Sequence, residues 1–179
     1  MIFEEKRISS QRIYEGAILN LRRDTVTVPG GTAYREIVEH NGAVAIVPIT
    51  KEGKLVMVKQ FRYPSGKILL EIPAGKIDKG ETNPEETARR ELKEETGYTA
   101  EYFHYMGSIN PSVAYTEEVI HLYAATGLIP GEADPDEDEA LELVEYDFGE
   151  AYKMAASGEL VDAKTIAAVF MAKEQLDIK

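Results

Sequence analysis

The sequence predicts an α+β fold with an N-terminal antiparallel β module, and three observations support this. In the first 41 residues, β-branched and apolar stretches flank the turn sequence Pro29-Gly30-Gly31. Short apolar stretches between 43 and 73 have the lengths of strands. A helix with capping signals begins near Asn83, and the C-terminal segment has helical spacing.

The N-terminal module is expected to span residues 1–41. Ala17–Val28 would form one strand, and Thr32–Glu39 would return as the second arm of a hairpin. A hairpin of this size is too small to hold a core of its own. We therefore expect the module to pack against a second subunit in a two-fold homodimer.

Residues 42–179 are expected to form the second domain. Six segments are predicted as strands: Ala43–Thr50, Leu55–Arg62, Ile68–Pro73, Glu101–Ser108, Val119–Ala125 and Leu141–Tyr146. The segment after the last strand is expected to be helical, because Ile166, Val169 and Ala172 are spaced for one buried face.

Composition excludes several classes of protein. Of the 179 residues, 44% are hydrophobic and 29% are charged, which is typical of a globular, soluble chain. No apolar run is long enough to span a membrane, and Met1–Gln11 lacks the apolar region of a secretory signal, so we expect a cytoplasmic protein. The absence of cysteine excludes disulfides and thiolate metal sites. A net charge of −12 argues against a nucleic-acid partner.

The most informative segment is the helix that begins at Asn83. Asn83 is a good N-cap, Pro84 suits the first helical position, and Gly97 suits the C-terminal end. Near that end, three carboxylates, those of Glu91, Glu94 and Glu95, fall within an arc of about 100° at helical spacing.

Like charges at this spacing repel one another, so something must compensate them. Carboxylate oxygens are hard ligands that suit Mg²⁺ or Mn²⁺, and Arg90 could steady Glu94 or the preceding Glu81. A solvated charged face with Arg–Glu pairs is the alternative interpretation. The glycine-rich turn before the capped helix favours the metal site.

The segment resembles the Nudix box, in which a glycine, a glutamate and an Arg-Glu-aliphatic-any-Glu-Glu-any-Gly run stand at fixed spacing. The matching residues are Gly75, Glu81, Arg90, Glu91, Leu92, Glu94, Glu95 and Gly97. Two positions depart from the pattern. Eight residues instead of seven separate Glu81 from Arg90, and Tyr98 replaces an aliphatic residue. The spacing within Arg90–Gly97 is intact, so the departure concerns the role of Glu81.

Further segments resemble the ADP-ribose pyrophosphatase branch of this family. They are Tyr34–His40, Val58–Arg62, Glu71–Gly75, Ile109–Pro111, Glu118–His121, Asp136–Glu139 and Asp162–Thr165. The resemblance implies a Nudix fold, in which a mixed β-sheet is sandwiched between helices. It also implies that the N-terminal module packs on, and swaps with, a partner subunit and contributes to substrate binding.

The resemblance also implies a set of site residues. Metal ligands would be Glu91, Glu94, Glu95 and the backbone carbonyl of Ala74, while Arg35 and Arg62 would contact the nucleotide. A surface ion pair is the alternative role for each arginine. Glu94, Glu118 and Glu137 complete the expected catalytic set, with Glu137 as the base in a separate acidic loop. Glu117 competes with Glu118, and Glu139 competes with Glu137.

The implied reaction is hydrolysis of a pyrophosphate bond with Mg²⁺ or Mn²⁺, converting ADP-ribose to AMP and ribose 5-phosphate. Divalent cations would also explain how an acidic protein accepts an anionic substrate. Two alternatives remain: hydrolysis of another nucleotide sugar or a dinucleotide, and a Nudix-fold protein that regulates or activates another enzyme. Retention of all the box carboxylates favours an enzyme.

Overall fold

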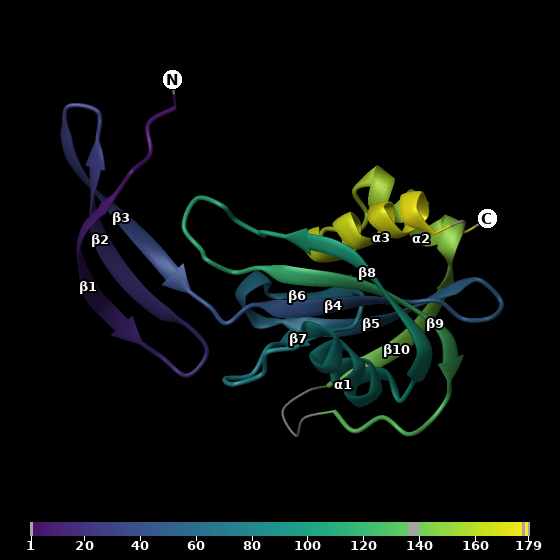
Figure 1. The fold of residues 1–179 in the computed structure, drawn as a ribbon. Helices are drawn as coiled ribbons and strands as arrows, with labels where there is room; N and C mark the ends of the chain where they lie inside the picture. Colours follow the sequence, from purple (N-terminus) through teal and green to yellow (C-terminus); the bar gives the residue numbers. More distant parts are fainter. Residues whose placement is uncertain (1, 136–139, 177, 179) are drawn as a thin grey trace. The chain divides into compact units, whose positions relative to one another are not determined.

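The computed structural model describes residues 2–135, 140–176 and 178 (Figure 1). The chain divides into two compact units. The N-terminal unit comprises Met1–Gly42 together with Asn110–Val119, and the main unit comprises Ala43–Ile109 together with Ile120–Lys179.

The N-terminal unit is a three-stranded antiparallel sheet in the order β1 (Arg7–Glu15), β2 (Asn20–Val28) and β3 (Gly31–Glu39). The predicted hairpin is β2 and β3, joined at the Pro29-Gly30-Gly31 turn. The strand β1 was not predicted. Its sequence is mostly polar and all nine of its residues are exposed, so no buried face imposes an apolar alternation on it.

The segment Asn110–Val119 is attached to the N-terminal unit through β3. Val38 donates its backbone N–H to the carbonyl of Tyr115 at 2.7 Å and accepts from the N–H of Glu117 at 3.0 Å. The Arg22 guanidinium reinforces this attachment, since it pairs with Glu39 at 2.7 Å and with Glu117 at 2.5 Å. The hydrogen bond to Glu117 is the main cause that raises the pKa of Arg22.

Among its described residues, the main unit contains two sheets and three α-helices. One sheet has the strand order β10-β5-β6, and the other has the order β7-β4-β9-β8. The strands are β4 (Ala43–Pro48), β5 (Lys54–Arg62), β6 (Lys67–Glu71), β7 (Ala74–Lys76), β8 (Thr99–Ile109), β9 (Ile120–Ile129) and β10 (Leu141–Asp147). The helices are α1 (Pro84–Thr96), α2 (Phe148–Ser157) and α3 (Ala163–Gln175), with a 3₁₀ turn at Tyr63–Ser65.

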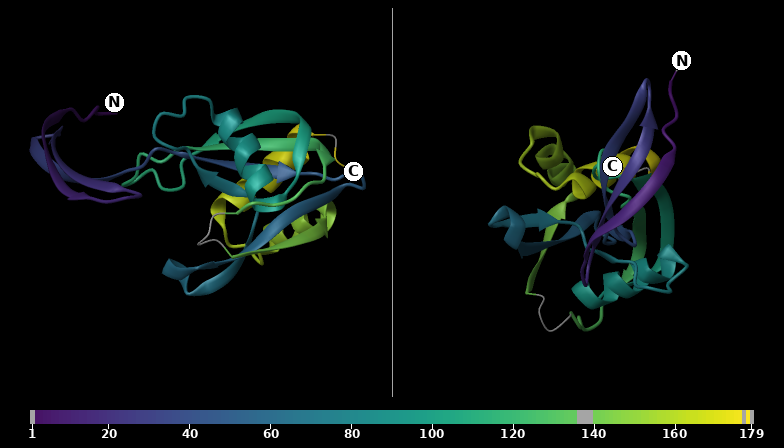
Figure 2. Two further views of the ribbon diagram at one scale, coloured as in Figure 1. Left: turned by 90° about the horizontal axis from the view of Figure 1, so that it is seen from below. Right: turned by 90° about the vertical axis from the view of Figure 1, so that its left-hand side faces the viewer.

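The four-stranded sheet is mixed, because β4 pairs in parallel with β9 and antiparallel with β7. Alternate residues of β4 point to opposite faces. Val44 and Ile46 pack with α1, while Ala45 and Val47 belong to the larger core with α2 and α3. Figure 2 shows the sheet strands and these helices in two further views. The predicted α+β fold, with a mixed sheet between helices, is therefore confirmed.

Two details of the main unit were not specified by the sequence pattern. The helical C-terminal segment is divided into α2 and α3, because Gly158 ends α2 in a left-handed conformation with φ of 81°. The short strand β7 forms within the glycine-rich turn. Among the described residues, no helix is both long enough and apolar enough to cross a membrane.

Candidate functional site

The helix α1 begins and ends where the sequence predicts. The Asn83 side chain accepts a hydrogen bond from the N–H of Glu85, and Gly97 ends the helix with φ of 74° while its N–H donates to the carbonyl of Lys93. Ala88 and Leu92 are fully buried against the mixed sheet. Burial of this face fixes the rotation of the helix and therefore the direction of its acidic face.

Two carboxylates of α1 lie against the same short backbone segment, Ala74-Gly75. Glu95 is buried, and its Oε2 accepts a hydrogen bond from the N–H of Ala74 at 3.1 Å. A Cβ atom placed on Gly75 would lie only 1.9 Å from the carboxyl carbon of Glu91. The Glu91 carboxylate therefore occupies the space that any larger residue at position 75 would need.

Arg90 neutralises part of this acidic face. Its guanidinium Nη1 lies 2.9 Å from Glu91 and 2.7 Å from Glu94, and its Nε lies 3.5 Å from Glu81. Although burial opposes it, the neighbouring carboxylates, led by the charge of Glu91, raise the pKa of Arg90 above its ordinary value. Both pairings considered for Arg90, with Glu94 and with Glu81, are present.

Glu81 ties the loop before α1 to the helix. Its Oε2 accepts hydrogen bonds from the N–H of Asp78 at 2.8 Å and from the hydroxyl of Thr87 at 3.0 Å. The hydrogen bond from Asp78 is the main cause that lowers the pKa of Glu81. The residue that is extra relative to the Nudix box lies before the helix begins at Pro84, so the register within Arg90–Gly97 is undisturbed.

The donor set at this segment fits a hard divalent cation. Glu91 and Glu95 are one helical turn apart and converge on Ala74-Gly75, where a peptide carbonyl is also available, and all these donors are oxygens. Within the part of the chain that is described, no group of three or more acidic or histidine side chains is already arranged to hold a metal ion. Instead, the Arg90 guanidinium and the Ala74 N–H hold these carboxylates.

Arg62 and Arg35, the two arginines expected to contact substrate, both form ion pairs. Arg62 makes a bidentate pair with Glu71, with both N···O distances at 2.8 Å. Arg35 pairs with Glu5 through its Nη2 at 2.5 Å. The ion pairs considered as the alternative role are therefore present, and contact with substrate stays a prediction for both arginines.

Glu71 is buried at the centre of an ion cluster that was not predicted from the sequence. We call it the Glu71 cluster; its members are Arg62, Glu71, Asp162 and Lys164. The Lys164 ammonium donates to Glu71, and it donates to Asp162 at 3.0 Å. Glu71 and Lys164 are 93 residues apart, so no local sequence pattern could have linked them.

The remaining predicted residues are in other parts of the chain. Glu117 and Glu118 belong to the N-terminal unit, where Glu117 pairs with Arg22 and Glu118 lies 3.7 Å from Nδ1 of His40. Glu137 and Glu139 lie outside the described residues. Asp134, which precedes them, donates its backbone N–H to the carbonyl of Glu94 at 3.0 Å and so ties the start of the acidic loop to α1.

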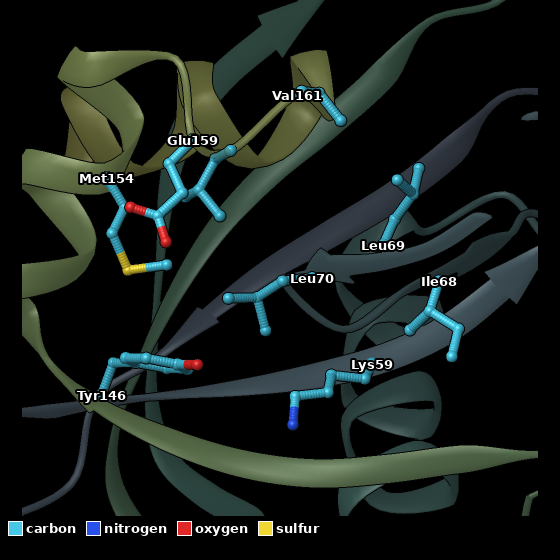
Figure 3. A pocket seen from close by; sticks show the side chains of 9 residues that line it. Lys59, Ile68, Leu69, Leu70, Tyr146, Met154, Glu159 and Val161 are labelled. Atoms are coloured by element: carbon cyan, nitrogen blue, oxygen red, sulfur yellow. The ribbon is translucent and has the colours of Figure 1, made fainter.

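A separate cavity of about 310 Å³ is formed between β5, β6, β10 and the loop after α2. Figure 3 shows Tyr146, Leu70 and Met154 around this space, with Lys59 at its edge. None of the box carboxylates line it, and its lining is largely aliphatic. We therefore place the candidate site at Ala74-Gly75 and α1.

Comparison with known protein families agrees with this geometry. Residues 39–169 match the NUDIX domain model. The chain belongs to the Nudix family. Residues 5–36 match a second model, the nucleoside diphosphate sugar hydrolase N-terminal domain.

Curated relatives match nearly the whole chain. An ADP-ribose pyrophosphatase from Bacillus subtilis is 44% identical, covering 93% of this chain and 91% of its own length. A methanol dehydrogenase activator from Bacillus methanolicus is 46% identical, covering 94% and 92%. The crystal structure of an ADP compounds hydrolase superposes with a TM-score of 0.85 at 22% identity, covering 99% of this chain and 96% of its own. This likeness supports the fold. The expectation of a Nudix pyrophosphohydrolase that resembles the ADP-ribose pyrophosphatases is confirmed.

The contact between Gly75 and Glu91 generates a prediction. Gly75→Ala should lower kcat/KM at least about a hundredfold, because the added methyl group displaces the Glu91 carboxylate. The melting temperature should change little, since the displaced atoms are the end of a flexible side chain. Steady-state kinetics and thermal unfolding test this, with Gly31→Ala as the glycine control, because Gly31 has no positive φ and an added Cβ there meets nothing within 4 Å. Wild-type kinetics in Gly75→Ala would contradict the assigned role of this contact.

Proposed function

We propose that this protein hydrolyses the pyrophosphate bond of ADP-ribose, using Mg²⁺ or Mn²⁺, to give AMP and ribose 5-phosphate. The observation that carries the proposal is the convergence of Glu91 and Glu95 on Ala74-Gly75. Two relatives that match most of the chain, from Bacillus subtilis and Mycobacterium tuberculosis, are named ADP-ribose pyrophosphatases.

Each group of residues has a distinct task in this proposal. Glu91, Glu94, Glu95 and the carbonyl of Ala74 would hold the metal, which supplies positive charge beside the diphosphate. Buried Leu92 and the Arg90 pairs keep these carboxylates in place before substrate arrives. Arg35 and Arg62 would bind the nucleotide, and an acidic side chain would accept the proton of the attacking water.

A second candidate function is activation of another enzyme, as the Bacillus methanolicus relative is named a methanol dehydrogenase activator. Its identity of 46% is similar to that of the Bacillus subtilis relative, so overall similarity does not separate the two functions. Another nucleotide sugar is a third candidate, because a Yersinia enterocolitica relative, 35% identical over 76% of this chain, is named a GDP-mannose pyrophosphatase.

A substrate panel tests the proposed function. Purified protein should release AMP from ADP-ribose with Mg²⁺ or Mn²⁺ faster than it cleaves GDP-mannose or a dinucleotide. Glu95→Gln should lower turnover at least about a hundredfold at saturating metal, because it removes a charged ligand. Glu85→Gln is a matched control on the same helix, where Glu85 pairs only with Arg89 in the described ion pairs. Absence of cleavage across the panel, or full activity in Glu95→Gln, would reject the proposal.

The N-terminal unit supports the proposal of a homodimer with active sites that use both chains. The strand β1 is exposed along its whole length. Among the described residues of the unit, Val26 is the only buried hydrophobic residue. Ile8 and Ile13 on β1 are 56% and 47% exposed within one chain. An isolated three-stranded sheet with so little apolar burial has little independent stability, so association with a second copy would stabilise it.

Light scattering at micromolar concentration should therefore give twice the mass of one chain. Replacing Ile8 and Ile13 together with glutamate should shift the mass toward that of a monomer, because charges would be placed in the proposed interface. Ile129→Glu is a control, since Ile129 is 52% exposed at the end of β9 in the main unit. A fully active wild-type monomer would rule out the dimer.

The general base is proposed to be Glu137, in the acidic loop that Asp134 ties to the end of α1. Glu137→Gln should lower kcat by roughly 10²–10⁴ with little change in KM or metal affinity, as expected for loss of a general base. Glu139→Gln should be mild. If Glu139→Gln is the impaired variant, the loop assignment is wrong by two residues. If both variants stay within about threefold of wild type, the base lies elsewhere, with Glu118 and Glu117 tested next.

A further inference from the structure

Glu71 is almost fully buried and has two cationic partners from different elements. Its side chain is 2% exposed at the end of β6. Arg62, from β5, binds both carboxylate oxygens, and Lys164, from the first turn of α3, binds Oε2 as well. Although burial opposes it, these two cations lower the pKa of Glu71 below its usual range, so it stays a carboxylate.

The two cations differ in their exposure and in their other contacts. The Lys164 side chain is 12% exposed, and its ammonium is also held by Asp162. Asp162 is itself fixed as the N-cap of α3, where its carboxylate accepts from the N–H of Thr165 at 3.0 Å. The Arg62 side chain is 41% exposed, and within the described part of the chain it pairs with Glu71. Lys164 is therefore the fixed cation of the cluster, and Arg62 is the exposed one.

A buried carboxylate that loses its cation is strongly destabilising. If Arg62 were the sole cation at Glu71, moving its guanidinium to a phosphate would leave the carboxylate uncompensated. With Lys164 in place, Glu71 keeps one fixed positive partner when Arg62 turns away. The two cations and two anions of the Glu71 cluster balance, so an additional anion is needed to compete for Arg62.

The Glu71 cluster is also connected to the candidate site along the chain. Glu71 is three residues before Ala74, whose N–H is bound by Glu95. Between them, Ile72 donates its N–H to the hydroxyl of Thr165 at 3.0 Å. The charge of Glu95 also contributes to raising the pKa of Arg62, after the main effect of the Glu71 hydrogen bond. A diphosphate at the box carboxylates would thus lie in the electrostatic range of this guanidinium.

We infer that Lys164 is a positioning residue that holds Glu71 so that Arg62 can exchange from Glu71 to the diphosphate of the substrate. The inference rests on the proposed function, because it requires a diphosphate ligand at the candidate site. In this arrangement Lys164 does not touch substrate; it sets how strongly Glu71 competes with the phosphate for Arg62.

The test uses α,β-methylene ADP-ribose, a non-hydrolysable probe. Its binding to a set of variants is measured by titration calorimetry in the presence of Mg²⁺. Lys164→Met removes the second cation, and Lys164→Arg restores a positive charge. Glu71→Gln combined with Lys164→Met removes the competing carboxylate as well. Lys59→Met is the matched control, because it breaks a lysine–glutamate pair of 2.8 Å, with Glu142, outside the cluster.

The Kd of the probe should rise about tenfold in Lys164→Met, which is the size of one lost charge-assisted hydrogen bond. It should return to within about threefold of wild type in the double variant and in Lys164→Arg. With ADP-ribose as substrate, KM should follow the same order, while kcat changes less than KM. Lys59→Met should bind like wild type. Melting temperatures identify any variant that loses affinity because it is partly unfolded.

Two results would overturn the inference. An unchanged Kd in folded Lys164→Met would show that Lys164 does not act on Arg62. A double variant as weak as Lys164→Met would show that Glu71 does not compete for Arg62. Failure of the proposed function is separable, because it would appear in the wild-type protein as absence of probe binding and of ADP-ribose cleavage.

Discussion

The contact between the acidic face of α1 and the Ala74-Gly75 backbone is the constraint on which the candidate site depends. The Glu91 carboxylate fits against Gly75 because that residue has no side chain, and Glu95 is held by the Ala74 N–H. Both contacts require α1 to lie close to β7. That closeness is set by burial of Ala88 and Leu92 against the sheet, so the site is a consequence of core packing.

The close approach of α1 to β7 has an electrostatic cost, because it gathers the carboxylates of Glu91, Glu94 and Glu95 in a chain whose net charge is already −12. The structure distributes the compensation over groups of different kinds. Arg90 contacts Glu91 and Glu94 with its charge, while Ala74 contributes a peptide dipole to Glu95. An arginine suits this position because its several donors can serve more than one carboxylate at once.

The parts of the fold that could be predicted are those encoded by neighbouring residues. The caps of α1 at Asn83 and Gly97, the β2–β3 turn, and the acidic face of α1 all depend on spacings of a few residues. The strand β1 could not be found in this way, because an exposed strand has no buried face to leave an apolar pattern. Its pairing with β2, and not its own composition, identifies it.

The Glu71 cluster could not be predicted for a different reason, which is sequence separation. A short motif such as Asp162–Thr165 shows that a segment resembles a family, but it does not show which distant carboxylate its lysine contacts. The same limit applies to the attachment of Asn110–Val119 to β3, since its backbone pairing joins residues about 77 apart, Val38 and Tyr115. Long-range pairs of this kind are determined by the fold as a whole.

The segment Glu71–Ala74 joins the Glu71 cluster to the carboxylates of α1. Ile72 is held from the α3 side through Thr165, and the carbonyl of Pro73 accepts from the N–H of Ile46 in β4 at 2.9 Å. These backbone contacts fix the course of the segment without using the side chains of Glu71 or Glu95. A change at the Glu71 side chain leaves these two backbone contacts in place, whereas a change at Glu95 also removes the hydrogen bond from the Ala74 N–H.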